Sequence, residues 1–193
     1  AVDEYQMERK SLDVLIEVME AKRPILQRYM KMKAKLLGHS ETEALPWWDI
    51  VAPVGKNEKS YTIEEARDLL IEVFTPLSAD ITAVIERSFD EAWIDIYPRP
   101  GKRGGAFCSF QPTLKESRML TNYNGSYDAI STLAHELGHA YHGYTIKDHR
   151  PLNQSYSMPV AETASTFNET HLTLHMYEQA ESTEEKLSIL DNY

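Results

Sequence analysis

Apolar residues recur at three- and four-residue steps along much of the chain, which is the period of an amphipathic helix. The pattern predicts a first helix over residues 3–37, kinked or split at Pro24. Capping boxes at Thr62-x-x-Glu65 and Ser182-x-x-Glu185 predict two more helix starts. Further helices are predicted over residues 78–89, over residues 126–142 with Gly143 ending the helix, and from residue 157 onward with Ser157 as its cap.

The periodicity changes to strand-like alternation in the middle of the chain. Strands are predicted over residues 93–97, 106–110 and 118–123, and the first two are separated by the glycine-rich turn PRPGKRGG. The predicted fold class is therefore mainly α, with a small antiparallel β-ribbon or sheet ahead of the helix at residues 126–142.

Composition narrows the classes of protein. The chain has 193 residues, of which 42% are apolar and 26% are charged, as in a soluble globular domain. A formal net charge of −10 argues against a nucleic-acid partner. The single cysteine, Cys108, excludes an internal disulfide, and neither a membrane-spanning run nor a signal peptide is recognisable. We therefore expect a cytoplasmic protein without a membrane partner.

The stretch LAHELGHAYHGY contains the pattern His-Glu-x-x-His. His135 and His139 would lie about 40° apart around a helix and about 6 Å apart along it, so both imidazoles could bind one metal ion. Glu136 would lie beside the ion, where a general base can take a proton from water. A motif with only three fixed positions also occurs by chance. A third metal ligand is therefore needed to distinguish a metal site from a chance match.

Candidates for the third ligand follow the motif. Thr145 stands where a metzincin would carry its third histidine, which excludes that class. His142 is expected to hydrogen-bond near the site, with an ordinary core or surface histidine as the alternative. Glu162 and Glu169 fall on one face of the last long helix, with small residues between them. They suit a helix packed against the helix that carries His135 and His139, although two solvated surface glutamates would give the same spacing.

The two histidine- and glutamate-containing motifs resemble those of a known family. HELGHAYH followed by PVAETASTFNE is similar to the oligoendopeptidase F branch of the thimet-oligopeptidase family of zinc peptidases, and LPWWDIVAP, YTIEEA and GKRGGAFC match upstream in the same order. The resemblance implies a zincin-like, gluzincin catalytic core with one Zn²⁺ per chain. It implies that His135, His139 and Glu162 bind the zinc and that Glu136 is the catalytic base. Ser165 and Glu169 match recurring positions, so we expect them to support the ligands.

The resemblance predicts a zinc metalloendopeptidase that hydrolyses short, unfolded peptides by attack of a zinc-bound water that Glu136 deprotonates. We expect Gly105, Ala106 and Phe107 to contact the peptide by strand pairing, unless this is an ordinary packed strand. One alternative function is a metal- and peptide-binding module without turnover. A remote alternative is a di-iron carboxylate helical protein, which needs two Glu-x-x-His motifs where this sequence has one.

The predicted organisation is one catalytic-core domain over residues 1–193. Residues 1–60 form a helical lead-in and connection, residues 61–125 form helices and the β-ribbon, and residues 126–193 form the zinc-binding helices. The chain starts without Met and stops just after a helix start, so we expect a fragment of a longer protein. Family members carry a C-terminal half that stabilises the transition state. The remaining N- and C-terminal parts of the parent enzyme are therefore expected partners.

Overall fold

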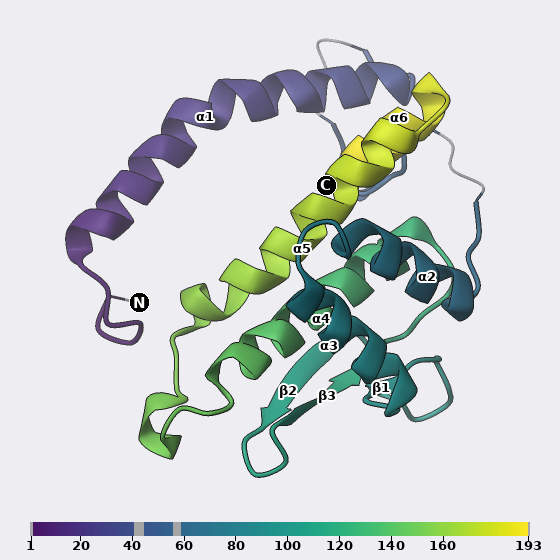
Figure 1. The fold of residues 1–193 in the computed structure, drawn as a ribbon. Coiled ribbons are helices and arrows are strands. Elements are labelled where there is room, and N and C mark those ends of the chain that lie inside the picture. Colours follow the sequence, from purple (N-terminus) through teal and green to yellow (C-terminus); the bar gives the residue numbers. More distant parts are fainter. Residues whose placement is uncertain (1, 41–44, 56–58, 193) are drawn as a thin grey trace. The chain divides into compact units, whose positions relative to one another are not determined.

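The computed structural model describes residues 2–40, 45–55 and 59–192. Within these ranges the protein is mainly helical with one small sheet, as the sequence predicts (Figure 1). The helices are α1 (Arg9–Leu36), α2 (Ile63–Phe74), α3 (Ala79–Asp90), α4 (Tyr127–Ile146), α5 (Met158–Gln179) and α6 (Thr183–Asp191). The strands are β1 (Ile94–Asp95), β2 (Phe107–Gln111) and β3 (Glu116–Leu120), and short 3₁₀ turns occur at Trp47–Asp49 and Pro151–Asn153.

The chain forms two compact units, residues 1–57 with 181–192 and residues 58–180. In the first unit α1 continues unbroken through Pro24, so the predicted split does not occur. A buried ion pair of 2.8 Å between Lys33 and Asp191 joins α1 to α6, and Asp191 also accepts hydrogen bonds from the Tyr29 hydroxyl and the Val54 N–H. These bonds compensate the cost of burying the Asp191 carboxylate. The prediction of a single catalytic-core domain stays a prediction.

The sheet belongs to the second unit and has the strand order β1-β3-β2. β2 and β3 form the predicted antiparallel hairpin, with Phe107 opposite Leu120. β1 pairs with β3 in parallel, with Ile94 opposite Met119, so the sheet is mixed rather than purely antiparallel. The reason is the long connection between β1 and β2, which leaves room for β3 to return between them. Strand β2 therefore lies at an edge of the sheet.

Two glycines set how closely α4 approaches its neighbours. A Cβ atom at Gly138 would lie 2.4 Å from the Ala164 carbonyl oxygen and 2.6 Å from the Ser165 Cα, so the backbones of α4 and α5 are in contact there. A Cβ at Gly143 would lie 2.6 Å from the Phe110 ring. The prediction that Gly143 ends its helix is wrong, because α4 continues to Ile146 and this glycine makes space for β2 instead.

The core of the second unit lies around the buried side of α4. Its fully buried large side chains come from four helices, which are α2, α3, α4 and α5: Leu70, Phe74, Ile85, Ile130, Leu133, Leu137 and Leu172. The Thr62–Glu65 capping box predicted for α2 is present, with both reciprocal hydrogen bonds. None of the helices in the described ranges has the length and apolar character that crossing a bilayer requires.

The contact at Gly138 yields a stability prediction. Gly138→Ala should lower the free energy of unfolding by roughly 1–3 kcal/mol or more, because the new methyl group meets backbone atoms that cannot rotate away. Urea denaturation of the full-length protein measures this. The matched control is Gly104→Ala, because a Cβ there meets nothing within 4 Å. Equal stability of the two variants would contradict the close packing of α4 on α5.

Candidate metal centre

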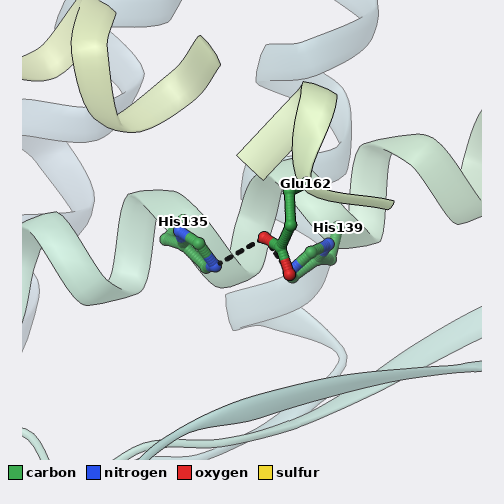
Figure 2. Close-up of side chains that lie close together, drawn as sticks. All are labelled: His135, His139 and Glu162. Carbon is green, nitrogen blue, oxygen red and sulfur yellow. Dashed lines mark ion pairs between the residues drawn. The ribbon is translucent and has the colours of Figure 1, made fainter. Parts of the chain in front are cut away.

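Three side chains converge on one point between α4 and α5 (Figure 2). The ligand atoms offered by His135, His139 and Glu162 all lie within 4.8 Å of one another. Glu162 Oε2 is 3.3 Å from His135 Nε2 and 3.5 Å from His139 Nε2. Spacing of four residues places both histidines on one face of α4, and Glu162 reaches them from the first turns of α5.

The distances from Glu162 to the two imidazoles fit a tetrahedral metal ion. Two ligand atoms, each about 2.0–2.1 Å from one tetrahedral ion, lie roughly 3.4 Å apart. The distances of 3.3 and 3.5 Å from the carboxylate to the two imidazoles match that separation. Burial lowers the pKa of His139, which favours the neutral imidazole that binds metals. The trio could therefore hold a metal ion.

Glu136 is the neighbouring group without an evident structural role. Its side chain is buried, with the residue 5% exposed, and its Oε2 atom has no hydrogen-bond partner among the residues that the structure describes. Burial raises the pKa of Glu136 to about 7, while His135 opposes the shift. A buried carboxylate oxygen without a partner is costly, so it is typical of a functional group rather than a structural one.

Two residues of α5 contact the ligands directly. Ser165 donates a 2.7 Å hydrogen bond to Oε2 of Glu162, the same oxygen that faces the imidazoles. Glu169 Oε2 lies 3.2 Å from His135 Nδ1, which leaves the opposite ring nitrogen directed at Glu162. The supporting roles expected for Ser165 and Glu169 agree with these positions and stay predictions.

His142 contacts an aromatic ring. Its ring contacts the Tyr156 ring, with the centroids 4.3 Å apart, and burial lowers its pKa. The expected hydrogen bond near the site stays a prediction. Sequence reasoning missed Ser131, which donates to Glu169 at 3.5 Å, and Asn168, which donates to the Ala134 carbonyl at 3.3 Å. Their partners lie more than thirty residues away, so no local pattern could reveal them.

The hydrogen bonds of the sheet determine which groups of β2 face away from it. The N–H groups of Met119 and Thr121 donate to the carbonyls of Trp93 and Asp95, on the β1 side of β3, so the N–H and C=O groups of the alternate residues of β3 face β2. In the observed register these pair with Phe107, Ser109 and Gln111. The N–H and C=O groups of the residues between them, which are Ala106, Cys108 and Phe110, therefore point to the unpaired edge. We call this set the free edge of β2.

Strand β2 packs against α4, close to the candidate metal centre. Burial raises the pKa of the Cys108 thiol to about 12, a hydrogen bond with Ser117 opposes the shift, and the nearby Glu136 carboxylate adds to it. Such a thiol is protonated and unreactive at neutral pH. Of the three residues predicted to contact substrate, Ala106 faces the free edge, Phe107 pairs with β3, and Gly105 lies in the preceding loop. Their contact with substrate stays a prediction.

Comparison with known proteins places this chain in a family. The sequence model of Peptidase family M3 matches residues 4–193. The chain is 31% identical over 182 residues to Group B oligopeptidase PepB of Streptococcus agalactiae, which covers 94% of this chain and 30% of that protein. It is 30% identical over 182 residues to Oligopeptidase PepF of Bacillus subtilis, covering 93% of this chain and 27% of that protein. The chain thus spans less than a third of the length of these relatives.

Solved structures share the fold. A crystal structure of a peptidase from Chlamydophila abortus matches with a TM-score of 0.79 and 30% identity, covering 96% of this chain and 31% of that one. PZ peptidase A, solved with an inhibitor, matches with a TM-score of 0.68 at 18% identity, covering 88% and 29%. The family resemblance and the gluzincin-type fold expected from the sequence are confirmed.

The contact between Glu169 and His135 yields a prediction about metal affinity. Glu169→Ala should weaken divalent-metal binding roughly 10–100-fold, because His135 loses the carboxylate that orients its ring. Competition with a chromophoric chelator measures the change in the full-length protein. The control is Glu178→Ala, which removes an exposed carboxylate from the same helix. Similar affinities of the two variants would contradict an orienting role for Glu169.

Proposed function

The chain belongs to peptidase family M3, and from this premise we propose that the protein is a zinc metallo-oligopeptidase that hydrolyses peptide bonds in short, unfolded peptides. The observation that carries the proposal is the buried Glu136 carboxylate, whose Oε2 has no partner among the described residues, beside the trio His135, His139 and Glu162. A general base needs such a free oxygen next to the metal. The names of the relatives, which are oligopeptidases, support the substrate class.

The donor set supports zinc as the metal. Two histidines and one glutamate are the protein ligands of one class of catalytic zinc sites, which leave a further position open. When bound, zinc lowers the pKa of a water ligand to about 7 and polarises the substrate carbonyl. His135 and His139 would hold the ion through their Nε2 atoms and Glu162 through Oε2.

The remaining chemistry belongs to residues of this chain. Glu136 accepts the proton of the attacking water on its free oxygen and then passes it to the leaving amine. Burial raises the pKa of Glu136, so its carboxylate holds a proton more tightly than an exposed glutamate does, which suits a general base. Glu169 fixes the ring of His135, and Ser165 fixes the Glu162 oxygen that faces the imidazoles.

The free edge of β2 is the proposed binding surface for the peptide backbone. An extended peptide can add to a sheet edge through its own N–H and C=O groups, which gives affinity without requiring a particular sequence. The partners on the protein would be the backbone groups of Ala106, Cys108 and Phe110. Because Cys108 lies near Glu136, a peptide paired there would place a peptide bond near the base.

The alternative functions receive less support. A di-iron protein needs a second cluster of metal ligands, and in residues 2–40, 45–55 and 59–192 the His135 trio is the one candidate metal site. A peptide-binding module without turnover would not need the free oxygen of Glu136. A cytoplasmic location and the lack of nucleic-acid or membrane partners stay predictions, as does dependence on further parts of a parent enzyme.

Two substitutions separate metal binding from chemistry. In the full-length protein, Glu136→Gln should retain zinc. It should reduce kcat/KM for a fluorogenic peptide roughly 10²–10⁴-fold, because the amide cannot accept a proton. His139→Ala should lose both zinc and activity, because it removes a ligand. Zinc is measured by elemental analysis of the purified proteins. Cleavage by Glu136→Gln at nearly the wild-type rate would falsify the proposed base, and a His139→Ala variant with full zinc would contradict the ligand set.

Strand pairing predicts an alternating response to N-methylation of the peptide. Along a β-strand, successive N–H groups point to opposite sides, so every second amide of the substrate would face β2. A methyl group on those amides removes a donor and blocks the approach, so KM should rise about tenfold, while methylation of the intervening amides should change KM little. Kinetics with singly methylated peptides measure this. An equal effect at successive positions would rule out pairing along the free edge.

A further inference from the structure

The loop that precedes β2 is held by side chains rather than by the sheet. Gly105 has a φ of +80°, a left-handed conformation that breaks the regular strand geometry. Extending the register of the hairpin by two residues places Gly105 opposite Asn122, beyond the last paired residues, Phe107 and Leu120. The backbone pairing stops there, and some other group must fix the chain as it enters β2.

Asn122 supplies that group. Its Nδ2 donates to the Arg103 carbonyl at 3.0 Å and to the Gly105 carbonyl at 2.8 Å. The other half of the loop is held by the buried ammonium of Lys102, which donates to the carbonyls of Asp95 and Tyr97, both at 2.9 Å. The loop is thus tied to the ends of β1 and β3, and Asn122 is the tie next to Ala106.

The same amide borders an opening beside the metal helix. A cavity of about 220 Å³ is lined by Gly105, Ala106 and Asn122 on one side and by Asp128, Ala129 and Thr132 on the other. Thr132 precedes His135 by three residues, so the cavity continues along the ligand-bearing face of α4 toward its N-terminus. A peptide that follows the free edge of β2 past Ala106 would reach this cavity.

We propose that Asn122 is a positioning residue for the substrate, which fixes the Ala106 end of the free edge of β2 by holding the carbonyls of Arg103 and Gly105. The inference rests on the proposed peptidase function and deepens it. Cys108 needs no such tie, because Phe107 and Ser109 on either side of it pair with β3. Loss of the Asn122 amide therefore releases one end of the binding edge and leaves its centre in place.

The test compares two peptides in the full-length protein. One extends along β2 to Ala106, and the other is truncated so that it ends near the scissile bond. Asn122→Ala should lower kcat/KM for the longer peptide about 2- to 10-fold, the equivalent of one main-chain hydrogen bond, mainly through KM. The truncated peptide should be cleaved as by the wild type. Asn122→Asp should lose at least as much, because it keeps the shape but presents oxygens to two carbonyl oxygens.

Methylated peptides make the test specific to the free edge. In Asn122→Ala, the KM penalty for methylating the amide opposite Ala106 should disappear, while the penalty opposite Cys108 should remain. The matched control is Asn192→Ala, which removes a similar 3.0 Å amide-to-carbonyl bond, to Ser188 in α6. Zinc content and melting temperature are measured for every variant.

Two results would overturn the positioning role. One is wild-type kinetics of Asn122→Ala and Asn122→Asp on the longer peptide. The other is an equal loss for both peptides at unchanged zinc content, which would mean a general structural role. Failure of the wild type, fully loaded with zinc, to cleave either peptide would instead overturn the proposed function and this inference with it.

Discussion

The backbone contact between α4 and α5 at Gly138 is the constraint on which the candidate site depends. The absence of a side chain lets Ala164 and Ser165 approach the helix that carries both histidines. At that separation of α4 and α5, Glu162 reaches the two imidazoles. Glu169, on the same face of α5 further along the helix, contacts His135. Buried polar contacts, such as Asn168 with the Ala134 carbonyl, fix the relative rotation of the helices. A wider crossing would separate the glutamate from the histidines by more than one ion can bridge.

Much of the candidate metal centre could be predicted because its information is local. The spacing of His135 and His139 needs only the helical period, and the position of Glu162 needs only a second helix and a resemblance of motifs. The helix starts at Thr62 and Ser182 were likewise readable, because a cap is a contact across three residues. Features that depend on distant contacts were not readable. The parallel pairing of β1 with β3 and the continuation of α4 past Gly143, against Phe110, are two examples.

The proposed substrate-binding strand shows the same limit of sequence-based prediction. The sequence indicated the segment from Gly105 to Phe107 but could not separate its members, because alternation along a strand has meaning only once the register is known. The register and the hydrogen bonds on the β1 side leave the backbone N–H and C=O groups of Ala106 pointing away from β3 and those of Phe107 pointing toward it. A shift of one residue in the pairing of β2 with β3 would make Phe107 face the free edge and Ala106 face β3. The role of Asn122 is also a consequence of register, since it acts where the ladder of backbone bonds ends.

The two halves of the site are coupled through the face of β2 that packs on α4. The Phe110 ring fills the space left by the missing side chain at Gly143, and Cys108, on the same face, lies near Glu136. The distance between β2 and Glu136 is therefore set by side-chain packing between β2 and α4. The Glu136 carboxylate is itself buried, and its raised pKa follows from desolvation. A substitution that changes the volume at Cys108 or Phe110 would alter the position of a bound peptide and the proton affinity of the base together.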